Sequence, residues 1–370
     1  MKETKESDSD HYSSDDDHYS DDFENSPKKS PTKDTSTKDT STIDTSEAKE
    51  KEQDPGPEQK QEEQEETKDF TKEDSLPPSS GDWKEIPFNS IEIEEQIGGG
   101  GVGLVHRGYY QDREVAVKTL FDPKVNEALK AEFMNELIQT SRCQHPNVVS
   151  VIGACNQPPH LCFVMEICDC SLFDLLHTSH TNSFTPRQRL DMCTQIARGM
   201  EYLHYGLKPP LVHRDIKSHN VLVKDEGRTL KICDFGLVGT STVTAGTPNY
   251  MAPELFQSQP FSKAVDVYAY SIMCAEIFTQ QLPFRGYDVE DIRKVVVEGE
   301  RPELLSIDVP DRVMDIIVRG WSGKPEDRPN FHEITEEMEK ALEETPEVSA
   351  LEEMDMLMSG GGGDALDGLM

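Results

Sequence analysis

The chain has 370 residues, a formal net charge of −34 at pH 7, and 35% of its residues in the apolar set that runs from Ala and Val to Tyr and Cys. This acidic balance disfavours sequence-independent binding of nucleic acid, which depends on Lys and Arg releasing counterions from phosphates. No apolar run reaches the ~18 residues that span a membrane, and residues 1–10 are charged where a signal peptide is apolar, so we expect a cytoplasmic protein, with access to the nucleus left open.

Residues 1–84 form an acidic, low-complexity segment that we predict to be disordered. The first 80 residues contain 25 acidic, 11 basic and 8 apolar residues, so little apolar surface can offset the entropy of ordering. Three similar pentads follow one another at 32–46. One interpretation is a solvated tail. The other is a docking arm tuned by phosphorylation, at Ser20 and at the Ser-Pro steps of Ser26 and Ser30.

The pattern of regular structure begins at Trp83, first with strands and then with helices. Alternating residues predict strands at 91–97, 102–107 and 114–120, and short apolar runs predict two more at 148–155 and 161–167. Apolar residues spaced by three or four predict a helix at 127–142. Longer helical periods follow at 172–177, 186–205, 262–279, 288–298, 309–319 and 331–344. The chain therefore divides into a strand-rich lobe at about 91–166, a helix-rich lobe at about 167–344, and a flexible acidic and Gly-rich tail at 345–370.

A glycine-rich stretch, GxGxxGxV at 98–105, lies between the first two predicted strands. Glycine lets a backbone approach a polyphosphate, but the same pattern marks dinucleotide sites and ordinary turns. A dinucleotide fingerprint opens a helix after its glycines, whereas this chain continues as a strand to Lys118. Lys118 is then either a lysine at a sheet edge with its ammonium in water, or a phosphate ligand held by Glu136 on the following helix.

Two polar motifs stand between apolar runs further along: HRDIKSHN at 213–220 and CDFG at 233–236. Two carboxylates and an amide in this setting suit chemistry on a metal-bound phosphate. A carboxylate and an amide oxygen are hard ligands for Mg2+, and a second carboxylate can orient a hydroxyl nucleophile. An acid–base hydrolase is the alternative use of the carboxylate pair, but no water-activating His or Cys cluster accompanies it.

Together these motifs resemble the eukaryotic protein kinase domain, over about residues 90–340. The glycine loop, VAVK, the helix glutamate, HRDIKSHN, DFG and APE at 252–254 occur in the family's order. The resemblance implies an α+β, bilobal protein kinase fold at 91–344, with a small β-rich N-lobe carrying one main helix and a larger helical C-lobe. Segments such as IGAC at 152–155 are most similar to the tyrosine kinase-like branch, which includes mixed-lineage-like and Raf-like kinases.

The resemblance also assigns a nucleotide site. Lys118 would hold the α- and β-phosphates of ATP and pair with Glu136. Apolar side chains would enclose the adenine, and backbone groups at 166–168 would bond its edge. The whole set is Ile97, Gly98, Gly99, Gly100, Gly101, Val102, Gly103, Leu104, Val105, Ala116, Lys118, Glu136, Met165, Glu166, Cys168 and Leu222.

Catalysis would rest, by the same resemblance, on polar residues of the two later motifs together with Lys118. Asp215 would orient the substrate hydroxyl and accept its proton, and Lys217 would stabilise the transferring phosphoryl group. Asn220 and Asp234 would be the metal ligands, for Mg2+ or Mn2+. In the helical lobe, a further set would brace the fold: Asp266 would hold the catalytic loop, and Arg328 would pair with Glu254.

Serine and threonine are the favoured acceptors. Lys217 stands two residues after Asp215, and the segment GTP at 246–248 follows, as in Ser/Thr kinases, with the Thr247 hydroxyl near Asp215. We therefore expect a protein kinase of intracellular signalling that acts on Ser and Thr. Dual specificity and tyrosine activity stay open, because the tyrosine kinase-like branch includes such members.

Some features leave regulation open. Val102 stands at the loop tip, where an aromatic residue often covers the phosphates. Thr140 stands where the family has an apolar residue, so it either weakens the active position of its helix or packs through its methyl group. Phosphorylation at Ser241, Thr242 or Thr244, engaged by Arg214, is expected to raise activity. The thiol of Cys233 is expected to face the pocket and to be inert.

Two other classes of function are alternatives to a kinase. A pseudokinase scaffold would use the same fold to bind partners, and a small-molecule phosphotransferase is disfavoured by the APE segment and the helices after it. The expected partners are protein substrates with Ser or Thr acceptors and an upstream activating kinase, without nucleic acid and without membrane insertion. The stretch 351–358 is either a solvated tail or a docking segment. The sequence does not reveal the oligomeric state.

Overall fold

The computed structural model describes residues 83–100, 103–120, 127–157, 160–178, 183–239, 245–304 and 309–347. Several predictions made from the sequence lie outside these residues: the disorder of the first segment up to residue 82, the tip of the glycine loop, the phosphorylation sites at 241–244 and the tail from residue 348.

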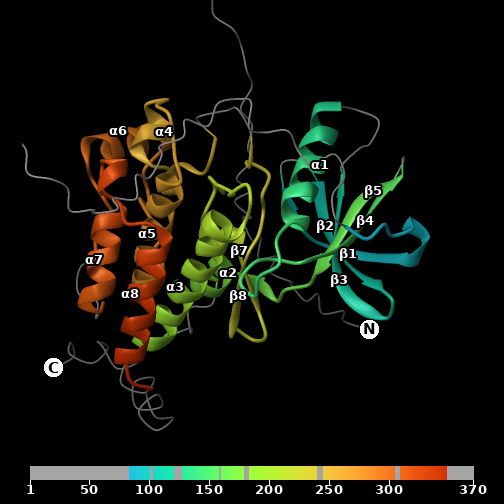
Figure 1. Ribbon diagram of the computed structural model, residues 1–370, viewed down its shortest axis with the longest axis horizontal. Coiled ribbons are helices and arrows are strands. Elements are labelled where there is room, and N and C mark those ends of the chain that lie inside the picture. The colour runs from blue at the N-terminus through green and yellow to red at the C-terminus, as the bar shows by residue number, and fades with distance from the viewer. Residues whose placement is uncertain are drawn as a thin grey trace, which may run out of the picture. The chain divides into compact units, whose positions relative to one another are not determined.

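The N-lobe is built on a five-stranded antiparallel sheet in the order β1-β2-β3-β5-β4 (Figure 1). The strands are β1 (Ile91–Gly100), β2 (Gly103–Tyr110), β3 (Arg113–Leu120), β4 (Val151–Gln157) and β5 (His160–Glu166). The predicted strands are confirmed, but β2 is longer than the alternation indicated. Gln111 and Asp112 have φ of 51° and 57° and close a two-residue turn, so pairing continues to Tyr110 opposite Arg113.

Helix α1 (Glu127–Ser141) packs its apolar side against this sheet. Phe133 and Leu137 are buried there with side chains from β3, β4 and β5, and the rings of Phe133 and Phe163 lie 5.2 Å apart. The predicted helix at 127–142 is therefore confirmed. Since Glu136 is on this helix, the packing positions it with respect to β3 and Lys118.

The segment just before β1 is part of the same packing. The Ile86 amide donates to the Ala154 carbonyl of β4 at 2.8 Å, and the Ala154 amide donates to Lys84 at 2.9 Å. Ile86 is fully buried. Gly153 is needed beneath it, because a Cβ there would lie 2.5 Å from the Lys84 carbonyl oxygen. Trp83 also packs against the cluster formed by α1 and the sheet.

The C-lobe is mainly helical, with a small sheet of order β6-β7-β8 (Figure 1). Its strands are β6 (Cys170–Ser171), β7 (Val221–Lys224) and β8 (Thr229–Ile232). Its helices are α2 (Leu172–His177), α3 (Pro186–Glu201), α4 (Pro253–Phe256), α5 (Ala264–Thr279), α6 (Val289–Glu298), α7 (Asp311–Gly320) and α8 (Phe331–Glu344). Helix α5 is buried almost throughout, which explains why its apolar residues form no single stripe.

One predicted helix, at 186–205, changes its winding near its end. The α-helix α3 stops at Glu201, and a π-helix follows over Tyr202–Gly206. The Tyr202 hydroxyl accepts a hydrogen bond from the Gln144 amide at 2.9 Å, and the ring packs so closely on Gly206 that a Cβ there would lie 2.7 Å from it. Apolar periodicity over so few residues does not distinguish the two windings.

Within the described ranges, no helix combines the length and the apolar character needed to cross a membrane.

Candidate active site

Lys118 of β3 and Glu136 of α1 form a buried ion pair. The Nζ atom lies 2.5 Å from Oε1, and the two residues are 7% and 3% exposed. Burial lowers the pKa of Lys118, but the carboxylates of Glu136 and Asp234 together raise it above its ordinary value. The ammonium therefore stays charged at neutral pH, as a phosphate ligand must. Of the two interpretations of Lys118, the structure excludes the solvent-exposed lysine at a sheet edge.

Asp215 lies at the centre of a network of hydrogen bonds. Its Oδ1 accepts from both the backbone amide and the hydroxyl of Thr247, at 3.0 and 2.8 Å. Its Oδ2 accepts from the Asn220 amide at 2.9 Å and from the Lys217 ammonium at 3.0 Å. Lys217 also donates to the Thr247 hydroxyl at 2.7 Å. The predicted proximity of Thr247 and Asp215 is thus present, and the carboxylate is held in one orientation.

This network sets the charge state of Asp215. Burial raises the pKa of the carboxyl group, but the positive charge and hydrogen bond of Lys217, followed by the hydrogen bond of the Thr247 hydroxyl, outweigh burial and leave the pKa below its ordinary 3.8. Asp215 is therefore an anion throughout the neutral range. An ionised carboxylate can orient a hydroxyl group and accept its proton.

Lys217→Met is expected to raise the pKa of Asp215, because it removes the largest influence that opposes burial. In the wild type, proton acceptance is lost only as the pH falls through the lowered pKa of Asp215. In the variant, the acid limb of kcat/KM should move to higher pH, besides the fall in rate. A profile measured from about pH 4 to about pH 8 tests this shift, and a variant profile as flat as that of the wild type over this range would contradict it.

Asp234 and Asn220 are the predicted metal ligands, and they come from neighbouring loops. Asp234 is exposed and has a left-handed φ of 65°, and its Oδ1 accepts from the Gly236 amide at 3.2 Å. Asn220 uses its amide nitrogen on Asp215, so its oxygen is the atom suited to a cation. A carboxylate and an amide oxygen fit Mg2+, which takes few protein ligands and completes its shell with water and phosphates.

The residues after Asp234 are held in the C-lobe core. Phe235 is fully buried, 5.2 Å from the His213 ring between centroids. The Nδ1 atom of His213 accepts from the Asp215 amide at 3.3 Å, so its Nε2–H is the donor to the Cys233 carbonyl at 2.9 Å. One buried imidazole thus connects the segments that carry Asp215 and Asp234.

Asp266 of α5 holds the catalytic loop at its start, at His213 and Arg214, as predicted. Its Oδ2 accepts from the His213 amide at 2.8 Å, and its Oδ1 accepts from the Arg214 amide at 2.7 Å. His204 contacts Oδ2 at 2.8 Å. Asp266 is completely buried, so these bonds replace the water that the carboxylate loses on folding.

Glu276 is a second buried acid of α5, and no motif in the sequence points to it. Its Oε1 accepts from Ser218 at 2.8 Å and contacts His177 at 2.8 Å, and its Oε2 accepts from Tyr250 at 2.8 Å. It therefore joins the loop of Asp215 to the segment after Thr247. The available signal was a lone glutamate in an apolar helix, because a buried carboxylate requires partners.

The glycine loop spans the end of β1 and the start of β2, with Gly100 paired to Gly103, while Gly101 and Val102 lie outside the described residues. Gly103 is required by the sheet itself, because a Cβ there would lie 2.2 Å from the Thr119 carbonyl oxygen. At Gly98 the nearest atom would be 3.8 Å away, so the fold alone does not demand glycine there. A close approach by a ligand is a separate reason for a glycine at that position.

Four residues of the predicted nucleotide site lie on adjoining strands of the N-lobe sheet. Val105 pairs with Lys118 across β2 and β3, and Ala116 pairs with Met165 across β3 and β5. Since cross-strand partners share a face, these four side chains line one side of the sheet. Ile97 is 43% exposed near the loop. Cys168 and Leu222 are half-buried. The nucleotide-binding roles of the whole predicted set stay predictions.

The side chain of Glu166, at the end of β5, is bound to the C-lobe. Its two oxygens contact Lys224 at 2.6 Å and Lys231 at 2.9 Å, and it also accepts from the Ser150 amide at 2.9 Å. Burial raises the pKa of Glu166, but the hydrogen bonds and charges of these lysines outweigh burial and leave the pKa below its ordinary value. Its side chain is thus committed, which leaves only its backbone groups for a nucleotide.

Thr140 and Cys233 are two residues near the site whose roles the sequence left open. Thr140 is 2% exposed, and its hydroxyl donates to the Glu136 carbonyl one turn back at 2.7 Å, which leaves the methyl group for packing. Burial, followed by the charge of Asp234, raises the pKa of the Cys233 thiol well above its ordinary value. An uncharged thiol is a poor nucleophile, in agreement with the inert cysteine that we expected.

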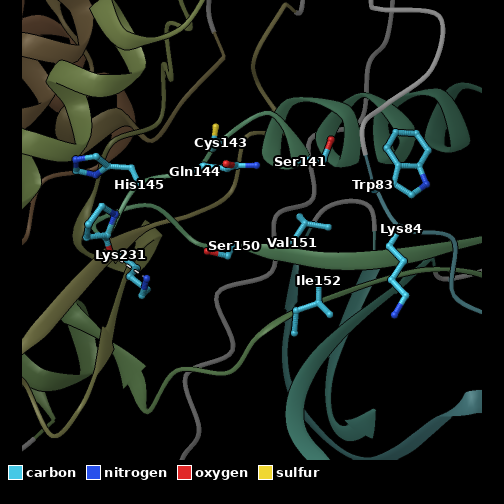
Figure 2. Close-up of a pocket in the computed structure, with 11 residues that line it drawn as sticks. Trp83, Lys84, Ser141, Cys143, Gln144, His145, Ser150, Val151, Ile152 and Lys231 are labelled. Carbon is cyan, nitrogen blue, oxygen red and sulfur yellow. Dashed lines mark hydrogen bonds between the residues drawn. The ribbon is translucent and has the colours of Figure 1, made fainter. Parts of the chain in front are cut away.

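A separate cavity of about 560 Å³ lies between Trp83 and Lys84 on one side and His145 and Lys231 on the other (Figure 2). Its remaining walls come from the end of α1, the loop after it and the start of β4. None of the predicted catalytic or nucleotide-binding residues lines it, so it is distinct from the candidate active site.

Comparison with known proteins places this geometry in context. Residues 91–338 match a family described as protein tyrosine and serine/threonine kinase. The chain is 37% identical over 265 residues to the serine/threonine-protein kinase CTR1 of Arabidopsis thaliana, covering 69% of this chain and 32% of that protein. It is 33% identical over 276 residues to mitogen-activated protein kinase kinase kinase 7 of Drosophila melanogaster, covering 70% and 40%.

A human relative gives a similar match. The chain is 33% identical over 273 residues to mitogen-activated protein kinase kinase kinase 10 of Homo sapiens, covering 69% of this chain and 28% of the relative. The chain therefore spans less than half the length of these three proteins.

Proposed function

The chain belongs to the family of protein tyrosine and serine/threonine kinases, and on this premise we propose that it transfers the γ-phosphate of ATP to Ser and Thr hydroxyls of proteins. The observation that carries the proposal is the arrangement of two groups. The Lys118–Glu136 ion pair offers a fixed cation for phosphates, and the ionised Asp215 carboxylate is held beside Lys217 and Thr247.

The proposed reaction divides its work among these residues. The substrate oxygen attacks the γ-phosphorus, the bond to ADP breaks, and the hydroxyl proton passes to an oxygen of Asp215. Lys217, 3.0 Å from that carboxylate, offsets charge on the moving phosphoryl group. Mg2+, held by Asn220 and Asp234, would neutralise charge on the phosphate oxygens. Positioning and electrostatics supply most of the catalysis in such a transfer.

The preference for Ser and Thr is supported by the position of Thr247. Its hydroxyl and amide both bond to Asp215, and Lys217 bonds to the same hydroxyl, so this segment lies directly against the predicted base. A shallow acceptor site next to Asp215 suits the short side chains of Ser and Thr better than the long side chain of Tyr. One of the three relatives, CTR1 of Arabidopsis thaliana, is named a serine/threonine-protein kinase, which supports the same preference.

We also propose the partners and the location of the protein. Protein substrates follow from the kinase function, and an upstream activating kinase is expected to act on residues 241–244. The cytoplasmic location rests on the sequence alone. The buried Arg214, next to Asp215, supports a role for a phosphate in that segment, because its side chain already contacts the Leu237 carbonyl at 3.4 Å, close to where the segment begins.

The test is phosphate incorporation from radiolabelled ATP and Mg2+ into a peptide array with separate Ser, Thr and Tyr acceptors. We expect label on Ser and Thr peptides, and none when EDTA removes the metal. Label confined to Tyr peptides would overturn the acceptor preference. If the purified protein binds ATP but transfers label neither to a peptide nor to itself, this result would favour the pseudokinase scaffold.

A further inference from the structure

Helix α1 presents a row of polar side chains to the C-lobe. Asn135 and Gln139 are four residues apart, so they lie on one side of the helix, and Arg142 directly follows the last helical residue, Ser141. The two ends of the row contact main-chain carbonyls of the C-lobe. This row is separate from Phe133 and Leu137, which pack against the sheet.

Asn135 makes the contact that bears on the active site. Its Nδ2 donates to the Val238 carbonyl at 2.8 Å, across a separation of 103 residues. Val238 closes a turn, because its own amide donates to the Phe235 carbonyl at 3.1 Å. The turn begins at Phe235, directly after Asp234. Asn135 therefore bonds the segment that carries Asp234, while its neighbour Glu136 bonds Lys118.

The row continues to a second anchor. Gln139 donates to the Asn135 side chain at 3.4 Å, and Arg142 donates to Gln139 at 2.6 Å. Arg142 also donates to the Pro209 carbonyl at 2.8 Å, in the loop that leads to the catalytic motif. Helix α1 is thus held to the C-lobe at two places, one near its middle and one just beyond its last residue.

We propose that Asn135 is a positioning residue, which couples the position of the Phe235–Val238 turn, directly after Asp234, to the Lys118–Glu136 ion pair. This inference rests on the proposed function. When the turn is in the described position, the bond to Val238 fixes the rotation of α1 that directs Glu136 toward Lys118. When the turn moves, α1 loses this contact and Lys118 loses its fixed anion. Phosphate binding weakens as a result, while the adenine pocket on β2, β3 and β5 keeps its shape.

Asn135→Asp tests the coupling, since it keeps the size of the side chain but places a carboxylate against the Val238 carbonyl. Asn135→Ala removes the donor without adding charge, and Arg142→Met removes the second anchor. The matched control is Glu132→Gln, the reverse exchange at an exposed position of the same helix. Calorimetry would give the Kd of each protein for a non-hydrolysable ATP analogue with Mg2+ and for adenosine, and thermal melting would report the fold.

Both Asn135 variants should raise the Kd for the ATP analogue by roughly three- to tenfold, the range expected for one lost hydrogen bond, and leave the Kd for adenosine unchanged. Glu132→Gln should change neither. Equal analogue affinity in Asn135→Asp and Glu132→Gln would overturn the proposal, and so would a parallel loss of adenosine binding, which would indicate a damaged pocket. Both ligand affinities are measured without phosphate transfer. A protein that transfers no phosphate would therefore refute the proposed function, while the affinities would still test the role of Asn135.

Discussion

Asp215→Asn is expected to lower kcat for phosphate transfer by about 10²–10⁴-fold, the range that general-base catalysis contributes. An amide does not accept the proton of the substrate hydroxyl at neutral pH. The exchange also disturbs the network, because each carboxylate oxygen of Asp215 accepts two hydrogen bonds. Whichever oxygen the amide nitrogen replaced, that nitrogen would face two hydrogen-bond donors. Initial rates with saturating ATP and a Ser/Thr peptide give the measurement.

The control is Asp112→Asn, in the turn between β2 and β3. Asp112 is exposed and has a φ of 57°, a conformation that Asn also adopts readily. This variant should keep the wild-type rate. If the two variants had equal rates, Asp215 would not be the base, and the proposed mechanism would fail even if the protein proved to be a kinase.

Arg328→Met is expected to destabilise the C-lobe by about 3–5 kcal/mol, the loss typical of a buried ion pair with one partner removed. The Nη1 and Nη2 atoms of Arg328 bond the two oxygens of Glu254 at 2.6 and 2.8 Å. The side chain of Arg328 is fully buried and that of Glu254 is 4% exposed. The same guanidinium also bonds the carbonyls of Ala264 and Ser322 at 2.9 and 3.0 Å. Urea unfolding followed by tryptophan fluorescence measures the change.

Two further variants separate the causes of this loss. The double variant Glu254→Met with Arg328→Met removes the stranded carboxylate, so it should be more stable than Arg328→Met alone. Arg312→Met breaks a pair with Glu337 and Glu344 at the surface, and it should leave stability nearly unchanged. If Arg328→Met were as stable as the wild type, the structural role of the Arg328–Glu254 ion pair would be contradicted.

Much of the active site could be predicted because its residues lie in short, ordered motifs. Lys118 and Glu136 are only 18 residues apart, on a strand and on the helix that follows it, and their pairing was expected. The two lobes followed from a change of period, from alternation to helical spacing. Asp266 and Arg328 were expected only because of the resemblance to a family, since nothing local indicates their partners.

Long-range polar contacts were not predictable in this way. The bond from Asn135 to Val238, and the two lysines that bind Glu166, join segments that do not share a motif. A surface asparagine and one that bonds a distant carbonyl look the same in a sequence, because the distinction depends on which backbone groups the fold leaves unpaired. Glu276 is the intermediate case, since its burial in an apolar helix was foreseeable but its partners were not.

The pairing of residues 84–86 with β4 also affects how the chain can be shortened. A truncated protein beginning at Ile91 would keep every residue of the candidate active site, yet it would lose the buried Ile86 and leave the Ala154 amide and carbonyl without their partners. A protein beginning at Trp83 keeps both. We therefore expect the shortest autonomous catalytic unit to start ahead of its first strand, at a boundary set by the packing on β4 rather than by the chemistry of the site.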